Sequence, residues 1–284
     1  MTIGSYETVK VEKEDGIGWL IMNRPEKRNA MNPQMHFDMD AVLPEIEADP
    51  DIAVVILTGA GEAFCAGQDL REYFRGLDGD PVGRRRAGEA SERWRNRRLM
   101  SFNKPTVAMV NGYCIGGGFT QMLCCDFAIA ADEAVFGLSE VNWGILPGGL
   151  VSKKLTDTLL FRHAMYYACT GRTLDGKRAA EIGLVNESYP RDRLRDETVA
   201  LARELMAKNQ EVLRATKHAI RAVRTMNDDQ AFDYLAAKGA EIKQRDRENA
   251  YANGIKQFLD DKSYKPTFGA YDRDRAIRDN EAAE

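Results

Sequence analysis

The chain has 284 residues and a formal net charge of −4. A negative balance provides no overall basic field that would favour nucleic acid or an anionic membrane surface. No apolar run approaches the roughly 20 residues that span a bilayer, and residues 1–14 lack the apolar core of a secretory signal. These properties predict a cytoplasmic protein without nucleic-acid or membrane partners.

The five cysteines favour a reducing compartment as well. They are odd in number and show no metal-ligand spacing, and Cys124 and Cys125 are adjacent in an apolar stretch where neighbouring side chains diverge. We therefore expect free, mostly buried thiols and no metal site.

The first half of the chain alternates short strands with helices. Apolar runs of strand length occupy residues 9–12, 17–22, 53–57, 106–110, 127–131 and 135–138. Asp15-Gly16 predicts a hairpin between the first two runs. Asn32-Pro33 supplies an N-cap and a first-turn proline for a helix that continues through residue 46. Strands that alternate with helices predict a layered α/β core with crossover connections.

Residues 76–98 differ from the rest of this half in being rich in Gly, Asp and Arg. Seven arginines fall between Arg84 and Arg98, but two glutamates interrupt them and only Trp94 offers a ring for base stacking. We expect a mobile loop on the surface followed by a charged helix exposed to solvent, in preference to a patch that binds nucleic acid.

Beyond about residue 150 the pattern becomes almost wholly helical as far as residue 259, with no heptads and no repeat of fixed period. We expect one main domain over residues 1–200 and a C-terminal helical region over residues 201–284.

Candidate chemistry is confined to two glycine-bearing loops, residues 66–70 and 112–120, each of which directly follows an apolar strand. The chain has no phosphate loop, dinucleotide turn, zinc helix or nucleophile elbow, and its three histidines are expected at surface or supporting positions. A helix that begins at Gly117-Gly118 directs free N–H groups outward. Two backbone donors from separate loops can stabilise an oxyanion, although spacing alone is explained equally well by ordinary turn glycines.

A longer series of motifs resembles one enzyme superfamily. The motifs are Asn23-Arg24-Pro25-Glu26-Lys27-Arg28-Asn29-Ala30, Leu57-Thr58-Gly59, Phe64-Cys65-Ala66-Gly67-Gln68-Asp69-Leu70, Lys104-Pro105-Thr106, Asn111-Gly112 and Gly116-Gly117-Gly118. In this order, and over nearly the whole chain, they resemble the enoyl-CoA hydratase/isomerase (crotonase) superfamily. The resemblance implies a crotonase/ClpP-like spiral of ββα units, a C-terminal helical trimerisation region, and a homotrimer or a dimer of trimers.

The resemblance also implies an acyl-CoA site in which coenzyme A is part of the substrate and no cofactor is tightly bound. The oxyanion donors would be the backbone amides of Gln68 and Gly117. Glu140 would be the principal acid/base, since Thr120 stands where the familiar hydratases carry a second glutamate. Lys27 and Arg28 are expected near the CoA nucleotide, and a strand from Ala66 to Leu70 along its adenine and pantetheine. The full set of expected substrate contacts is Lys27, Arg28, Ala66, Gly67, Asp69, Leu70, Arg71, Ser139, Trp143 and Gly148.

Three stretches, residues 71–74, 136–145 and 258–266, look like the hydroxycinnamoyl-CoA hydratase-lyases. That subfamily carries a small hydroxyl residue where Thr120 stands. It hydrates feruloyl-, caffeoyl- or 4-coumaroyl-CoA and cleaves the β-hydroxy thioester to an aromatic aldehyde, such as vanillin, and acetyl-CoA. The likeness implies that Glu140 activates water, that Thr120 orients it and that Tyr73 closes the aromatic end of the pocket.

The chain departs from this subfamily at Ala236, where a tyrosine that reads a phenol is expected. Tyr234 lies about 200° away around a helix. Gln68 replaces a commoner methionine, and Gln121 and Leu146 replace prolines. An enoyl-CoA hydratase or isomerase that acts on another acyl-CoA therefore stays open, as do hydration without cleavage and a non-catalytic binding protein of the same fold.

Overall fold

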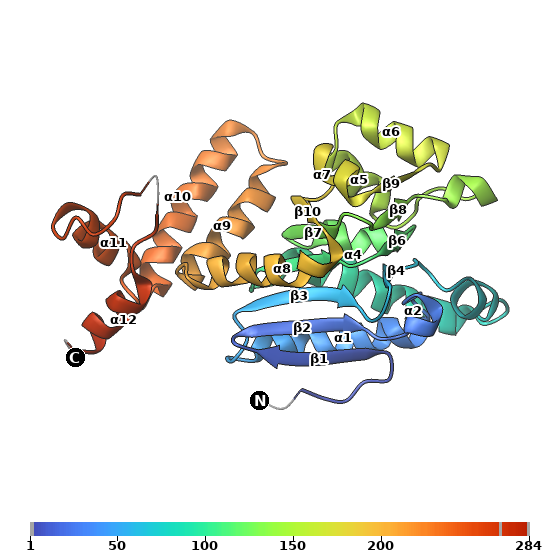
Figure 1. The fold of residues 1–284 in the computed structure, drawn as a ribbon, viewed down its shortest axis with the longest axis horizontal. Helices are drawn as coiled ribbons and strands as arrows, with labels where there is room; N and C mark the ends of the chain where they lie inside the picture. The colour runs from blue at the N-terminus through green and yellow to red at the C-terminus, as the bar shows by residue number, and fades with distance from the viewer. Residues whose placement is uncertain (1–2, 267–268, 283–284) are drawn as a thin grey trace. The chain divides into compact units, whose positions relative to one another are not determined.

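The computed structural model describes residues 3–266 and 269–282. The chain divides into two compact units, residues 1–202 and residues 203–284. The first unit contains both β-sheets, and the described residues of the second are helical apart from their connections (Figure 1). The α/β class predicted from the sequence is confirmed.

The larger sheet has six strands in the order β1-β2-β3-β5-β7-β10. They are β1 (Val9–Glu14), β2 (Ile17–Met22), β3 (Val54–Gly59), β5 (Thr106–Val110), β7 (Phe127–Ala131) and β10 (Glu187–Tyr189). The first two form the predicted antiparallel hairpin, and every other neighbouring pair is parallel. Figure 1 shows β1, β2 and β3 side by side. The short strands β9 (Thr173–Asp175) and β10 both lie in the region expected to be almost wholly helical, so that expectation is wrong at these two points.

The smaller sheet has four strands in the order β4-β6-β8-β9. They are β4 (Ala63–Cys65), β6 (Tyr113–Ile115), β8 (Val135–Gly137) and β9 (Thr173–Asp175). The first three are parallel, and each follows a strand of the larger sheet along the chain: β3 leads to β4, β5 to β6 and β7 to β8. A helical segment follows each pair. Because parallel strands end at the same edge of a sheet, the loops after β4, β6 and β8 meet there.

The helical segments of the first unit cover these sheets. They are η1 (Pro25–Lys27), α1 (Pro33–Ala48), η2 (Leu70–Arg75), α2 (Pro81–Ser91), η3 (Glu92–Arg98), α3 (Leu99–Ser101), α4 (Gly118–Cys124), η4 (Glu140–Trp143), α5 (Val151–Thr158), α6 (Phe161–Thr170) and α7 (Gly176–Glu181). The predicted start of α1 is confirmed, because the Asn32 side chain accepts a hydrogen bond from Met35 N at 2.9 Å. The helix buries Met35, Met39, Val42 and Ile46 in the core.

Residues 66–70 do not form the strand that was expected along the CoA. The strand ends at Cys65 because Gly67 has φ +93°, which an extended strand does not allow. Gln68 keeps an isolated bridge to Met31, and Asp69 then caps the wide-turned helix η2 through hydrogen bonds from Arg71 N and Glu72 N. The segment is a loop that turns its backbone groups away from the sheet.

The charged segment around Arg95 also differs from its prediction. Trp94 and Arg95 are buried, whereas the arginines around them are partly or fully exposed. The reason is that α2 and η3 pack against α1, which turns one side of this helical stretch towards the core. The expectation of a fully solvated helix is therefore wrong on that side.

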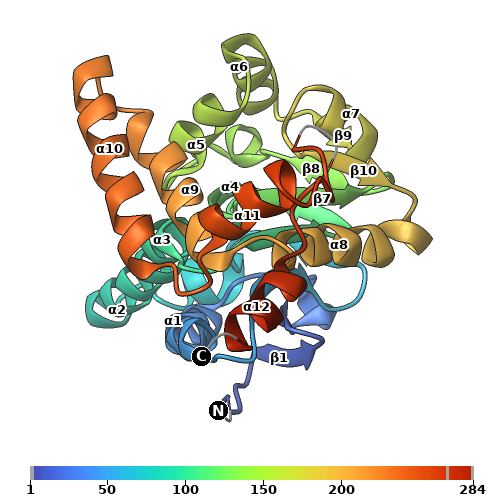
Figure 2. The ribbon, with the colours of Figure 1, turned by 90° about the vertical axis from the view of Figure 1, so that its left-hand side faces the viewer.

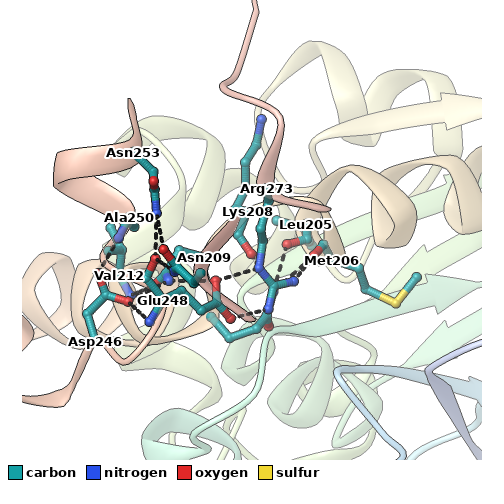
Figure 3. A network of polar contacts seen from close by, with 12 residues as sticks. Leu205, Met206, Lys208, Asn209, Val212, Asp246, Glu248, Ala250, Asn253 and Arg273 are labelled. Atoms are coloured by element: carbon teal, nitrogen blue, oxygen red, sulfur yellow. Dashed lines mark hydrogen bonds and ion pairs between the residues drawn. The ribbon is translucent and has the colours of Figure 1, made fainter. Parts of the chain in front are cut away.

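The second unit begins near the end of α8 (Arg191–Met206) and continues through α9 (Gln210–Val223), α10 (Asp228–Arg245), α11 (Ala250–Leu259) and α12 (Arg273–Glu281). Figure 2 shows α9 and α10 side by side. The Asn209 amide donates to Asp246 and Glu248, both at 2.9 Å, and Arg273 pairs with Glu248 (Figure 3). No helix among the described residues is both long and apolar enough to cross a membrane.

Asn29 gives a test of how the first unit is held together. Its side chain accepts from Arg24 N at 2.9 Å and donates to the carbonyls of Ala60 and Ala63 at 2.9 and 2.7 Å, in a fully buried position with φ +56°. Asn29→Ala leaves three backbone groups without a partner and places alanine in a left-handed conformation. We expect it to lower the free energy of unfolding by about 2–4 kcal/mol in urea titrations. Asn103→Ala, at an exposed position, should change it by less than about 0.5 kcal/mol, and equal losses would contradict this account.

Candidate active site

A cavity of about 1010 Å³ lies where the loops after β4, β6 and β8 meet, wholly within the first unit. Helices η2, α2 and η3 supply further parts of its wall. The expected site residues that line it are Ala66, Gly67, Gln68, Leu70, Tyr73, Gly117, Thr120, Ser139, Glu140, Trp143 and Gly148. The lining residues come from four separate stretches of the sequence, 66–74, 88–100, 115–120 and 139–150, which meet around one space.

The loops after β4 and β6 approach each other very closely. A β-carbon on Gly67 would lie 2.8 Å from Ile115 O and 3.3 Å from Gly117 N, so only glycine fits between them. Within residues 3–266 and 269–282, neither Gln68 N nor Gly117 N donates a hydrogen bond to a protein acceptor. Both belong to residues that line the cavity, so neither N–H group is already committed to a protein acceptor.

Glu140 lies beside this pair of amides. It is the first residue of η4, is only 6% exposed, and its Oε2 is buried without a hydrogen-bond partner among the described residues. A β-carbon on Gly116 would lie 3.0 Å from Glu140 Oε1, so the carboxyl group packs directly on the loop that presents Gly117 N. Burial raises the pKa of Glu140 above its usual value of 4.5. A carboxyl group in this state is suited to accepting and returning a proton.

The Gln68 side chain is held by a buried chain of hydrogen bonds. Trp94 Nε1 donates a hydrogen bond to His36 Nδ1 at 3.0 Å. Because Nδ1 is the acceptor in this bond, the neutral ring carries its hydrogen on Nε2. His36 Nε2 then donates to Gln68 Oε1 at 2.8 Å. Burial lowers the pKa of the fully buried His36 to about 3, so the ring is neutral at physiological pH. This chain anchors the loop that carries one oxyanion donor. Sequence reasoning could not identify it, because its three members lie far apart along the chain.

One end of the cavity is aromatic. The Tyr73 ring makes edge contacts with His36 and Phe74, with ring centroids 5.4 and 5.5 Å apart, and Phe74 makes an edge contact with Trp143 at 6.2 Å. Thr120 is buried on α4, where its backbone N–H donates to Gly117 O at 3.3 Å. The cavity thus has a polar centre at Glu140 and a wall of rings beside it.

Four expected contacts do not line the cavity: Lys27, Arg28, Asp69 and Arg71. Lys27 and Arg28 are exposed at η1, and Arg71 is exposed on η2, so their contact with CoA stays a prediction. Asp69 is buried and pairs with Arg24 at 3.0 Å, which makes it part of the scaffold beneath the loop. The described residues include no group of three His, Cys, Asp or Glu side chains that could hold a metal ion.

The family model for enoyl-CoA hydratase/isomerase matches residues 12–269. The chain belongs to this family. A hydroxycinnamoyl-CoA hydratase-lyase of Pseudomonas fluorescens is 52% identical over 271 residues, which cover 95% of this chain and 98% of that protein. A probable enoyl-CoA hydratase of Mycobacterium bovis is 33% identical over 248 residues, or 87% of this chain and 91% of that protein. The crystal structure of an enoyl-CoA hydratase from Polaromonas sp. has a TM-score of 0.81 at 27% identity and covers 88% of this chain and 96% of that one. The crotonase family and fold inferred from the motifs are confirmed.

A substitution at Gly116 tests whether the packing of the Glu140 carboxyl group against the loop that carries Gly117 matters for catalysis. Gly116 has φ +51°, and an added methyl group would press on the Glu140 carboxylate. We expect Gly116→Ala to lower kcat for an enoyl-CoA thioester by about 10–100-fold, because a displacement of about 1 Å at a catalytic group has effects of that order. Loss of the enoyl absorbance measures it. Gly183→Ala is the matched control, since Gly183 has φ +76° but no atom within 4 Å of the added carbon. Similar kinetics in the two variants would refute the link.

Proposed function

We propose that the protein hydrates an arylpropenoyl-CoA of the feruloyl-, caffeoyl- or 4-coumaroyl-CoA type. It then cleaves the β-hydroxy thioester to an aromatic aldehyde, of the vanillin type, and acetyl-CoA. The observation that carries this proposal is a buried carboxyl group in the cavity, Glu140, packed against the loop that carries Gly117, which lines the same cavity as Gln68. The 52% identity to a hydratase-lyase supports the aromatic substrate and the cleavage step.

The hydration step follows from this geometry. The Glu140 carboxylate takes a proton from water, and the hydroxide attacks Cβ of the enoyl thioester. The electron pair moves through Cα to the thioester oxygen, where the N–H groups of Gln68 and Gly117 stabilise the negative charge. Glu140 then returns its proton to Cα, which completes the β-hydroxy thioester and regenerates the carboxylate.

The cleavage step uses the same groups again. Glu140 removes the proton of the β-hydroxyl group, the C–O bond becomes the aldehyde carbonyl, and the Cα–Cβ bond breaks. The electron pair of the Cα–Cβ bond moves to the thioester oxygen and forms the enolate of acetyl-CoA. The two amides stabilise this oxygen as they did in the hydration step. Protonation at Cα by Glu140 gives acetyl-CoA. Each oxyanion donor is expected to contribute roughly 3–4 kcal/mol to the barrier reduction.

The aromatic end of the cavity favours an aryl group over an alkyl chain. Tyr73, Phe74 and Trp143 line the cavity and contact one another edge to face, and a further aromatic ring packs well against such a cluster. Thr120, buried one helical turn from Gly117, would orient the water molecule or the β-hydroxyl group. We assign Ser139 and Gly148 to the acyl border of the same pocket.

The assembly and location belong to the same proposal. The C-terminal helical region, residues 201–284, would serve oligomerisation as a homotrimer or a dimer of trimers. Apolar side chains that are exposed on α10 and α11, such as Phe232 at 75% and Leu259 at 57%, support this role. A cytoplasmic location suits five free cysteines, of which four are buried. Coenzyme A would take part only as the thioester of the substrate.

Incubation with feruloyl-CoA tests the proposed reaction. We expect release of vanillin and acetyl-CoA in equal amounts, followed by absorbance and chromatography. Hydrated thioester without aldehyde would instead identify an enoyl-CoA hydratase. A shifted double bond without either product would identify an isomerase, and an unchanged thioester would indicate a binding protein of this fold.

Glu140→Gln separates the catalytic role of this carboxyl group from a structural one. The amide cannot take a proton from water, so we expect turnover to fall by at least about 10³-fold. A buried carboxylate with one oxygen atom, Oε2, lacking a partner destabilises the fold when it is ionised at neutral pH, so the variant should melt at the same temperature as the wild type or higher. Glu181→Gln, at an exposed ion pair with Arg178, should leave the rate unchanged. Activity retained in Glu140→Gln would overturn the mechanism.

The pH dependence follows from the raised pKa of Glu140. The reaction needs the carboxylate form, which is lost as pH falls through the pKa of the folded protein. Since burial raises that pKa above 4.5, the acidic limb of kcat/KM should be centred above pH 4.5. Rates measured between pH 4 and pH 8 would show it. An acidic limb centred at or below pH 4.5 would argue against Glu140 as the base.

A further inference from the structure

The wall of the cavity contains a buried cation without an anionic partner. Arg95, on η3, is 6% exposed and lines the cavity. Its Nη1 donates to Gly117 O at 3.2 Å and its Nη2 to Ser91 Oγ at 2.6 Å, and both acceptors are neutral. Its Nε has no partner, and no carboxylate of residues 3–266 and 269–282 lies within 4.0 Å. Two of the five N–H groups of a guanidinium are thus used by the protein.

Arg24 shows how the same chain buries an arginine for structural purposes. It is 8% exposed and pairs with Asp69 at 3.0 Å and with Glu72 at 2.5 Å. Burying a charge is costly unless an opposite charge or a full set of hydrogen bonds accompanies it. Burial lowers the pKa of Arg95, but a guanidinium stays protonated at neutral pH. Arg95 therefore carries a charge that the described protein does not neutralise, at the wall of a ligand cavity.

Arg95 lies on the same wall of the cavity as Gly88, which is close to the side chain of Tyr73. Gly88, Ser91 and Arg95 recur at helical spacing along α2 and η3, and all three line the cavity. A β-carbon on Gly88 would lie 3.8 Å from the Tyr73 hydroxyl oxygen, so Tyr73 points towards this same helical wall. A ring that occupies the aromatic end would bring its substituents between Tyr73 and the wall that carries Arg95.

We propose that Arg95 determines substrate specificity by binding an oxygen substituent on the ring of the arylpropenoyl group. The oxygen of a ring hydroxyl group accepts a hydrogen bond from the guanidinium, and the positive charge stabilises the oxygen further as it gains negative charge. Hydroxylated rings are therefore preferred over an unsubstituted ring. This inference rests on the proposed function and adds the chemical feature of the substrate that the site reads.

Two thioesters that differ only in the ring hydroxyl group test this role: 4-coumaroyl-CoA and cinnamoyl-CoA. We expect the wild type to prefer 4-coumaroyl-CoA by at least about tenfold in kcat/KM, a discrimination typical of one charged hydrogen bond. Arg95→Gln should reduce this preference to less than about threefold by slowing the hydroxylated substrate alone. Arg93→Gln, at an exposed ion pair with Asp40, should keep the wild-type preference.

An equal loss on both substrates in Arg95→Gln would overturn the proposal, because it would mean that Arg95 acts only by supporting Gly117 and Ser91. A wild type that shows no preference between the two thioesters would overturn it as well, without any variant.

A binding measurement decides the matter even if Arg95→Gln does not fold. The wild type is titrated with 4-hydroxybenzaldehyde in the presence of acetyl-CoA, and the phenolate absorbance of the aldehyde is followed against pH. A cation beside the oxygen should lower the midpoint of ionisation of the bound aldehyde by about 1–3 pH units relative to the free aldehyde. An unshifted midpoint would refute the role of Arg95. This readout needs no turnover, so it stays informative if no arylpropenoyl-CoA is cleaved and the proposed function itself fails.

Discussion

The close approach of two backbone loops is the constraint on which the site depends. Gly67 and Gly116 adopt left-handed conformations, and the missing β-carbon of Gly67 lets the loop after β4 lie against the loop after β6. The proposed oxyanion site requires this approach, because its two amides come from these two loops. The parallel order of β4, β6 and β8 then brings Glu140 to the same edge of the smaller sheet. A side chain at Gly67 would separate the donors before any substrate bound.

Two sets of buried polar groups in the first unit contrast with each other. Three scaffold residues have partners for their polar groups: Arg24 has two carboxylates, Asn29 has three backbone partners, and His36 bonds to Trp94 and Gln68 through both ring nitrogens. In the cavity, by contrast, Glu140 Oε2 and Arg95 Nε are buried without partners. A buried polar atom without a hydrogen-bond partner destabilises a fold. It persists only where the surrounding structure is rigid enough to hold it in place. The satisfied network beneath the loops provides that rigidity.

Repeated use of one oxyanion pocket explains how a single carboxyl group can suffice. Both steps of the proposed reaction move an electron pair onto the same thioester oxygen, so the same two amides stabilise both enolates. Glu140 only has to accept and return a proton each time, and its burial keeps its pKa raised for that task. In the proposed function, the aromatic side chains and Arg95 concern the choice of substrate instead.

Local patterns in the sequence were enough for the hairpin, the N-cap at Asn32 and most of the parallel strands, because each depends on neighbouring residues. The motifs likewise pointed to Gln68, Gly117 and Glu140, which lie at strand ends where backbone conformation is set locally. The loop at residues 66–70, the inward turn of Arg95, the short strand β10 and the contact of His36 with Gln68 were decided only in three dimensions. Each of these results from packing between segments that are distant along the chain, and hydrophobic periodicity carries no information about which distant segment will be the neighbour.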